Sequence, residues 1–202
     1  MNRQFLKIGF TPPAINPDPA GEAAAISRLL ESGIIDLLHL RHPEATRADM
    51  AKILTLLDPP ILSRIAIHDH FRLIEEFPIG GLHLNSRNPE PPTTFDSGSE
   101  SFRISRSCHS FAELRECALR GEYTYLTLSP IFDSISKTGY LSKFDPDELT
   151  AQLKTLRSEI PSRPQIIALG GVTPDRIPML KAFGFDGAAM LGSLAPHFFC
   201  PR

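Results

Sequence analysis

The chain has 202 residues and a mass of 22.3 kDa, which predicts one well-buried domain over residues 1–202. Its 21 basic and 23 acidic side chains leave a formal net charge of −2, so no long-range field favours nucleic acid or an anionic membrane as a partner. The composition, 42% hydrophobic and 22% charged with no apolar run near the ~18 residues of a membrane span, excludes the disordered and membrane-spanning classes.

Short apolar runs alternate with longer amphipathic segments along the chain. Runs rich in β-branched and aliphatic residues predict buried strands at 5–10, 34–40, 61–67, 81–84, 102–105, 123–128, 165–169 and 187–191. Segments with helical spacing predict helices at 20–32, 46–57, 70–77, 110–120, 146–158 and 174–183. This alternation is typical of a parallel sheet, either open and doubly wound or closed into a barrel. Eight strands favour a single-domain α/β fold, the (β/α)8 or TIM barrel.

Helix starts are marked by capping residues. Ser110 is followed three residues later by Glu113 in a capping-box arrangement, and Asp145 and Thr173 each precede a proline at the first helical position. The Pro-, Ser- and Gly-rich stretch at 88–100 stands where a fourth helix belongs, so it predicts an irregular or mobile loop.

The N-terminus and the cysteines indicate a cytoplasmic location. The first residues are charged and lead into only a short apolar stretch, without the long apolar region and small-residue cleavage site of a secretory signal. Three cysteines without a CxxC pair favour neither a disulfide framework nor a cysteine zinc site. Cys108, beside a histidine, is interpreted as a small buried residue rather than as a nucleophile.

Histidines gather where the predicted strands end. Six of the seven histidines follow or close the second to fifth strands: His39, His42, His68, His70, His83 and His109. The carboxyl ends of the strands form the active-site face of a barrel, and scattered surface histidines do not predict such clustering. We therefore expect a functional site at this face, although His83, within a strand, is interpreted as a hydrogen-bonded structural histidine.

Two glycine-bearing turns near the C-terminus favour phosphate binding. Gly170 and Gly171 follow the seventh strand and allow a ligand to approach the backbone closely, while Gly192 and Ser193 open a last short helix. The free amide groups at such a helix start suit a phosphate dianion. The alternative is a pair of turns punctuated by glycine that bind nothing.

These motifs together resemble those of the thiamine phosphate synthase/TenI family across nearly the whole chain. The resemblance is carried by Leu40-Arg41, His68-Asp69, Gly81-Leu82-His83-Leu84, Ser107-Cys108-His109-Ser110 with Glu113, the block at 129–139, and Ala168-Leu169-Gly170-Gly171-Val172. It implies a (β/α)8 barrel in thiamine biosynthesis that binds a thiazole phosphate through Gly171, Gly192 and Ser193. The block at 129–139, which is similar to the family's GPIF-x-T-x-TK-x-G loop, adds Ser136 and Lys137 as expected anion contacts. Lys137 as a solvated surface lysine is the alternative.

The family contains synthases, and the chain departs from their pattern. Synthases join a pyrimidine diphosphate to the thiazole phosphate with Mg²⁺ and release pyrophosphate. The strand-two pattern Q-x-R-x-K here keeps Arg41, but His39 replaces the glutamine and Pro43 the lysine. Asp69 matches one metal-binding aspartate, with helix N-capping as its alternative role, whereas Asn88 replaces the other. Because Mg²⁺ prefers carboxylates, this weakens the expected site. The resemblance implies Arg41 and Lys137 as catalytic residues around the diphosphate, and His39 and Ser107 as further substrate contacts.

TenI-type members instead tautomerise a thiazole carboxylate phosphate and need no metal or other cofactor. The resemblance implies His109 as the general acid and base, since an imidazole can both accept and donate a proton. The alternative is that the surrounding motif only caps the helix at Ser110.

A TenI-type tautomerase is the favoured prediction, and thiamine phosphate synthase is the close alternative. A third reading is a silent paralogue that binds a thiazole or thiamine phosphate without catalysis. The only partner expected besides the small-molecule substrate is a second copy of the chain, because related barrels often dimerise. Closure of the loops at 88–100 and 133–141 over a ligand is not readable from the sequence.

Overall fold

The computed structural model describes residues 4–92, 101–133 and 144–199. The chain divides into two compact units, which are treated separately below. The N-terminal unit comprises Ile8–Arg103 with Leu194–Arg202, and the C-terminal unit comprises Ile104–Ser193 with Met1–Lys7. The single domain expected over residues 1–202 stays a prediction.

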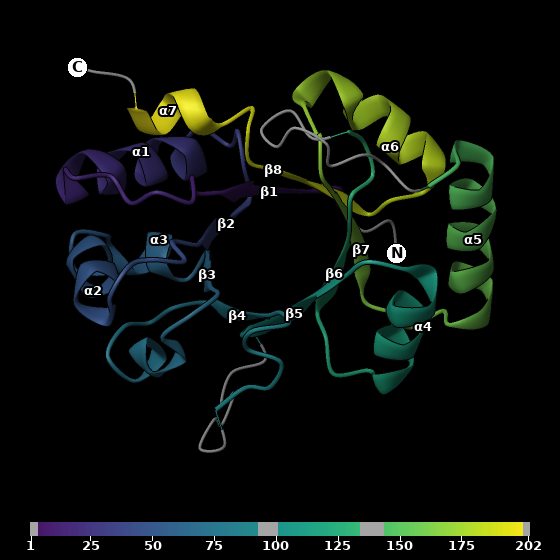
Figure 1. The fold of residues 1–202 in the computed structure, drawn as a ribbon, viewed down its shortest axis with the longest axis horizontal. Helices are drawn as coiled ribbons and strands as arrows, with labels where there is room; N and C mark the ends of the chain where they lie inside the picture. Colours follow the sequence, from purple (N-terminus) through teal and green to yellow (C-terminus); the bar gives the residue numbers. More distant parts are fainter. Residues whose placement is uncertain (1–3, 93–100, 134–143, 200–202) are drawn as a thin grey trace. The chain divides into compact units, whose positions relative to one another are not determined.

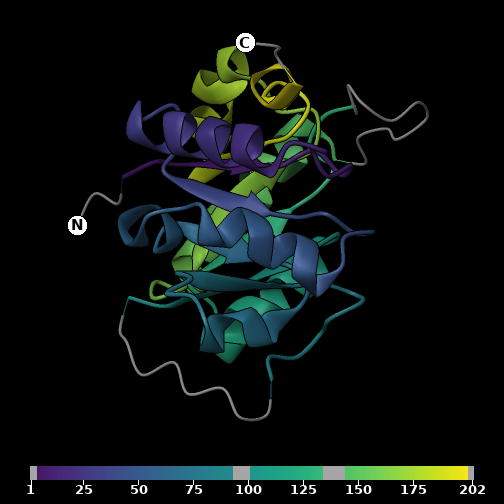
Figure 2. The ribbon, with the colours of Figure 1, turned by 90° about the vertical axis from the view of Figure 1, so that its left-hand side faces the viewer.

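The N-terminal unit contains the first four strands and their helices (Figure 1). In chain order its elements are β1 (Leu6–Phe10, from Ile8 onward), α1 (Pro19–Glu31), β2 (Leu37–Leu40), α2 (Arg47–Thr55), α3 (Pro59–Leu62), β3 (Ile65–Ile67), the 3₁₀ helix η1 (Phe71–Glu75), β4 (Gly81–Leu84) and α7 (Ala195–Phe199). Figures 1 and 2 show α7 beside α1, and Asn16 Nδ2 donates a hydrogen bond to the carbonyl of Phe198 there.

The C-terminal unit contains the last four strands. Its elements are β5 (Arg103–Cys108, from Ile104 onward), α4 (Phe111–Arg120), β6 (Tyr125–Leu128), α5 (Pro146–Glu159), β7 (Gln165–Leu169), the 3₁₀ helix η2 (Pro174–Arg176), α6 (Ile177–Phe183) and β8 (Gly187–Met190). Asp145 caps α5 by accepting hydrogen bonds from the amides of Asp147 and Glu148, as its place before a proline predicts.

Every described strand pair is parallel, and the strands follow one another in chain order around a closed barrel. The predicted (β/α)8 barrel is therefore confirmed, and the open doubly wound sheet is excluded. Strands β2, β3, β4, β6 and β8 are buried along their whole length, which explains why they read as nearly unbroken apolar runs.

Several of the predicted elements need correction. The strand expected at 102–105 runs on to Cys108, and the helix expected at 174–183 is divided into the 3₁₀ helix η2 and α6. The strand expected at 61–67 begins only at Ile65, because Pro59 and Pro60 start a short helix that includes Ile61 and Leu62. The helix expected at 70–77 is a five-residue 3₁₀ helix preceded by His70 in the left-handed region, at φ 54°. Residues 88–92 form neither helix nor strand, and the remainder of the loop expected at 88–100 lies outside the described residues.

Each unit contains an arginine that precedes a strand and binds a neighbouring helix-to-strand turn, the one before β2 for Arg64 and the one before β8 for Arg163. In the N-terminal unit, Arg64 donates hydrogen bonds to three carbonyl oxygens, those of Leu30, Ile35 and Asp36. In the C-terminal unit, Arg163 forms a two-pronged pair with the carboxylate of Asp186 at 2.6 and 3.1 Å.

Across the described ranges, no helix has both the length and the apolar character needed to cross a bilayer.

Candidate functional site

Three histidines meet on one face of the N-terminal strands. The β1–β2 and β2–β3 registers pair His39 with Phe10 and with Ala66. Because alternate residues of a strand share a face, His68, two residues beyond Ala66, lies on the same face as His39. The β3–β4 register then brings His83 beside His68. The parallel register, and not the spacing along the chain, creates this group, called here the imidazole cluster.

The imidazole cluster is tightly packed and almost fully buried. His39, His68 and His83 are 0, 3 and 0% exposed, and their ring centroids lie 4.3–4.9 Å apart. His39 Nδ1 and His68 Nε2 share a hydrogen bond of 2.8 Å. Phe10 contacts the rings with centroid distances of 4.5, 5.4 and 6.4 Å. These neighbours cover the His39 side chain in the structure. The expected contact of His39 with a substrate stays a prediction.

Burial lowers the pKa of both His39 and His68 well below the ordinary histidine value. The neighbouring rings of the cluster lower it further, as do nearby guanidiniums, those of Arg103 for His39 and of Arg41 and Arg87 for His68. Both imidazoles are therefore neutral at pH 7, and each offers one nitrogen lone pair.

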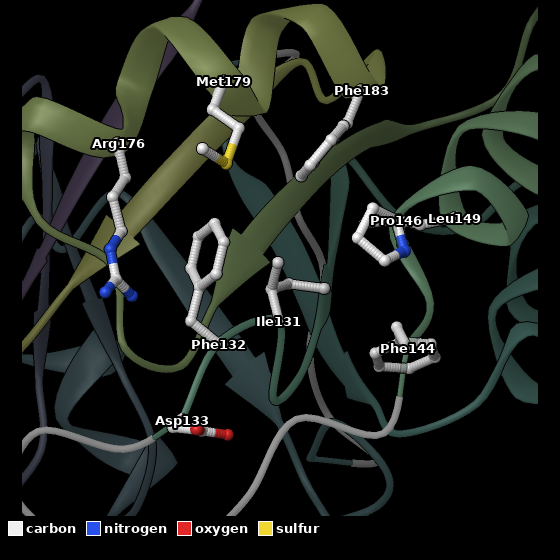
Figure 3. Close-up of a pocket in the computed structure, with 9 residues that line it drawn as sticks. All are labelled: Ile131, Phe132, Asp133, Phe144, Pro146, Leu149, Arg176, Met179 and Phe183. Atoms are coloured by element: carbon white, nitrogen blue, oxygen red, sulfur yellow. The ribbon is translucent and has the colours of Figure 1, made fainter.

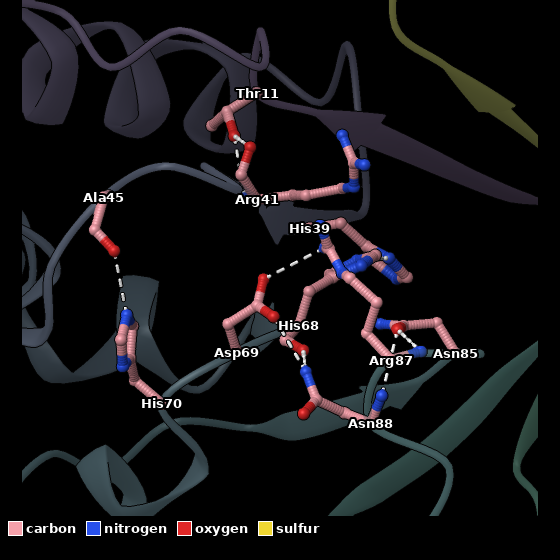
Figure 4. A network of polar contacts seen from close by, with 10 residues as sticks. All are labelled: Thr11, His39, Arg41, Ala45, His68, Asp69, His70, Asn85, Arg87 and Asn88. Atoms are coloured by element: carbon pink, nitrogen blue, oxygen red, sulfur yellow. Dashed lines mark hydrogen bonds and ion pairs between the residues drawn. The ribbon is translucent and has the colours of Figure 1, made fainter.

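Arg41, Asp69 and Arg87 follow β2, β3 and β4, the strands that position the imidazole cluster. Figure 4 shows Asn88 and Asp69 turned toward each other; Asn88 Nδ2 donates to Asp69 Oδ1 at 2.7 Å and to the carbonyl of His68 at 2.9 Å. Arg87 donates to the other carboxylate oxygen at 3.4 Å. The amide of Arg41 donates to Thr11 Oγ1 at 2.9 Å, which fixes the backbone after β2. Asp69 does not cap the following helix, whose N-cap is His70.

These contacts do not fit the Mg²⁺ that synthases of the family use. Asp69 is the one carboxylate of the expected pair, and both of its oxygens already accept hydrogen bonds from Asn88 and Arg87. The residue in the second aspartate position, Asn88, presents an N–H donor to Asp69 instead of a second negative charge. A hard cation that seeks carboxylate oxygens finds an amide and a guanidinium in their place.

In the C-terminal unit, the glycine turn after β7 is bent and closely packed. Gly170 and Gly171 have φ values of +94° and +61°, which favour glycine. A Cβ on Gly170 would lie 2.8 Å from Cα of Pro130, and one on Gly171 would lie 2.8 Å from Cβ of Phe132. The structure thus shows both glycines packed closely against the segment after β6. The sequence instead predicted that a ligand approaches the backbone at these glycines. Phosphate binding at this turn stays a prediction.

Arg176 is a site candidate that the sequence did not reveal. Its Nη1 donates to the carbonyl of Gly171 at 2.8 Å, and its guanidinium lies 4.5 Å from the centre of the Phe132 ring (Figure 3). Ser193 Oγ reaches the carbonyl of Val172 at 3.4 Å, so the second predicted turn lies beside the first. A basic residue shortly after a double glycine was the available signal.

His109 is held by the end of β6. Its Nδ1 lies 3.3 Å from the carbonyl oxygen and 3.2 Å from Oγ of Ser129. We assign the ring proton to Nδ1, because a carbonyl only accepts; Nε2 is then the nitrogen with a lone pair. Ser110 Oγ accepts from the amide of Glu113, while the Glu113 carboxylate accepts from the amide of His109 at 2.8 Å. The capping alternative is therefore real, yet the cap uses the backbone of His109 and leaves its ring available.

The remaining predicted residues have simpler outcomes. Ser107 Oγ accepts a long hydrogen bond of 3.5 Å from Thr127 Oγ1. Gly192 lies two residues before Leu194, in the turn that precedes α7. Ser136 and Lys137 lie outside the described residues, as does most of the loop at 133–141.

A pocket of about 320 Å³ opens between α5, α6 and the segment after β6. Figure 3 shows its mainly apolar wall, with Phe132, Met179 and Phe183 on one side and Phe144 and Leu149 on the other. Its polar groups, Asp133 and Arg176, stand at one end.

Comparison with known proteins decides the family. The family model described as thiamine monophosphate synthase matches residues 11–194, which is most of the chain. The chain belongs to this family. The resemblance inferred from its motifs is thereby confirmed, as is a role in thiamine biosynthesis at the level of the family.

Relatives of this thiamine monophosphate synthase family member bear the synthase name. The thiamine-phosphate synthase of Bordetella pertussis is 25% identical over 187 residues, covering 88% of this chain and 82% of the relative. Thiamine phosphate pyrophosphorylase from Bacteroides thetaiotaomicron is 31% identical in sequence. Its crystal structure matches this chain with a TM-score of 0.74 over 96% of this chain and 93% of that chain. The pyrophosphorylase from Pyrococcus furiosus, 16% identical with a TM-score of 0.69 over 96% and 89% of the two chains, shows the shared fold alone.

Proposed function

We propose that this family member is a TenI-type enzyme that tautomerises a thiazole phosphate by proton transfer. The observation that carries the proposal is the contact between Asn88 and Asp69. It places an amide donor where a synthase needs a second carboxylate for Mg²⁺, and a tautomerisation needs no metal to stabilise a leaving diphosphate.

The proposed step is an isomerisation centred on His109. Nε2 takes the proton of one carbon–hydrogen bond of the thiazole carboxylate phosphate while the electron pair moves into the ring system. The resulting imidazolium returns a proton at a second position, so the product is an aromatic isomer and nothing is oxidised or reduced. Ser129 supports this role because it fixes the tautomer in which Nε2 is the base.

The substrate phosphate is proposed to bind at the two glycine turns of the same unit. Among the described residues, none accepts a hydrogen bond from the amides of Gly171, Gly192 or Ser193. These donors, with the nearby guanidinium of Arg176, suit a dianion. Ser136 and Lys137 remain proposed contacts from the family motif, and a homodimer remains a prediction of the same kind.

The test is turnover of the thiazole carboxylate phosphate by purified protein, followed by proton NMR. Replacing His109→Gln keeps a polar side chain but removes the base, so we expect the rate to fall by ~10²–10⁴-fold. His197→Gln, an exposed histidine of α7, is the matched control and should retain the rate. Binding of the substrate without turnover by the unaltered chain would instead favour the silent paralogue.

Thiamine phosphate synthase is the second candidate, because the relatives carry that name and the chain keeps Arg41 and Asp69. Incubation with the pyrimidine diphosphate, the thiazole phosphate and Mg²⁺ tests it through release of pyrophosphate. Release that Asp69→Ala abolishes would overturn the tautomerase proposal. Absence of release, with restoration in Asn88→Asp, would trace the loss of synthase chemistry to the amide.

A further inference from the structure

The imidazole cluster is a group of potential metal ligands that the proposed reaction does not use. One ring nitrogen from each of His39, His68 and His83 lies within 4.8 Å of the other two. It is the one such group of three ligand side chains found in the parts of the chain that the structure describes. Its histidines come from three adjacent strands, whose paired backbones fix the spacing of their Cα atoms.

We propose that His39, His68 and His83 form a site for a divalent transition-metal ion of the zinc type. In a tetrahedral site with metal–nitrogen bonds of about 2.0–2.1 Å, the ligand nitrogens stand about 3.3 Å apart. The closest pair here is 2.8 Å apart and every pair is within 4.8 Å, so modest ring rotations about the side-chain torsions reach that geometry.

The chemistry of the donors selects the class of metal. Three imidazole nitrogens with no oxygen ligand among them suit Zn²⁺, Co²⁺, Ni²⁺ or Cu²⁺, whereas Mg²⁺ and Ca²⁺ require oxygen ligands. His39 and His68 share one hydrogen-bonding proton in the ion-free structure. Binding therefore requires that this proton move to the other nitrogen of its ring, with no net release of protons from the two rings, so that both facing nitrogens present lone pairs.

The groups around the imidazole cluster indicate what class of fourth ligand the metal ion would take. Phe10 packs against all three rings. The charged groups that act on the rings are guanidiniums: Arg41 and Arg87 for His68 and Arg103 for His39. They oppose a bare dication, so we infer that the ion binds with an anion, such as hydroxide or a phosphate oxygen, in its open position.

The test uses the chain without an affinity tag and Co²⁺ as a spectroscopic probe, with Zn²⁺ in calorimetry. A site of this kind predicts one Co²⁺ per chain, with the intense visible absorption of tetrahedral cobalt, displaced by Zn²⁺ but not by excess Mg²⁺. His68→Gln should weaken Zn²⁺ binding by ~100-fold, since it removes one of three ligands. His197→Gln should bind as the unaltered chain does.

The outcomes separate the possibilities without reference to turnover, so this inference stands apart from the proposed function. Weak, pale octahedral cobalt, or binding that His68→Gln leaves unchanged, overturns it. If His68→Gln fails to fold by circular dichroism, the cobalt spectrum and stoichiometry of the unaltered chain decide alone. Their absence overturns the proposal, and their presence supports it.

Discussion

The two units differ in what their strand ends present. The N-terminal unit presents the imidazole cluster and, after β3, the carboxylate of Asp69 with hydrogen bonds from Asn88 and Arg87. The C-terminal unit presents backbone amides at glycine turns and one oriented histidine, His109. The departures from the synthase pattern, His39, Pro43 and Asn88, all fall in the N-terminal unit. The comparison teaches that the departures weakening the expected metal site are confined to one unit, while the glycine turns proposed to hold a phosphate lie in the other.

The two units also differ in the partners of Arg64 and Arg163, the arginines that precede β3 and β7. Of the substitutions considered, we expect that of Arg163 to affect stability most. Arg163 is 6% exposed and makes the buried part of the ion pair with Asp186, so Arg163→Ala leaves that carboxylate only the exposed Arg157 at 3.3 Å and should cost about 3 kcal/mol or more. Arg64 binds only carbonyls, and Arg64→Ala should cost about 1–3 kcal/mol. Urea unfolding of both variants measures the contrast. Equal losses would contradict the distinction between a charged and a neutral partner.

The glycines provide the next contrast. Gly171 and Gly33 have nearly the same backbone angle, φ +61° and +69°, but only Gly171 is crowded by neighbouring atoms. Gly171→Ala should cost about 2–4 kcal/mol, from the backbone strain plus displacement of the segment at 130–133.

Gly33→Ala carries the same strain in open space and should cost about 1–2 kcal/mol. Thermal and urea unfolding compare the two variants. A similar cost for both would show that the packing against Phe132 is unimportant for stability.

The smallest effect concerns alkaline pH and the two described cysteines, which both lie in the C-terminal unit. Burial raises the pKa of the Cys108 thiol, whose hydrogen bond with Cys117 raises it further. Above the unfolded-state pKa of about 8.5, the unfolded chain loses a proton that the folded chain retains, so stability falls as pH rises.

The expected loss is about 1–2 kcal/mol between pH 8.5 and 10. Cys108→Ala should flatten this slope whatever its effect on absolute stability. Free energies of unfolding measured across that pH range provide the check, and an unchanged slope would count against the buried thiol as the cause.

The sequence predicted the fold well because hydrophobic periodicity is a local property. Gly81–Leu84 and Gln165–Leu169 are strands with the predicted bounds. The prediction was wrong at 61–67, because an apolar run does not reveal whether Ile61 belongs to a helix or to a strand. There the two prolines were the better guide.

The candidate site was less predictable, because its contacts depend on distant pairings. Strand ends indicated His39 and His68 as neighbours of a site, but only the register shows that their nitrogens share a hydrogen bond. The position of Asn88 suggested a weakened metal site, yet its direct donation to Asp69 depends on a loop conformation that no local pattern encodes. Arg176 was missed because its role arises from stacking on Phe132.

The exchange of a carboxylate for an amide at Asn88 also changes the electrostatic balance at the end of β3. Arg41 and Arg87 carry two positive charges there against the one negative charge of Asp69, so the locality has a surplus of one positive charge. A surplus of this kind attracts anions from solution without the help of an ion. Its influence weakens as added salt shortens the Debye length, so the attraction of anions to this strand end falls as the ionic strength rises.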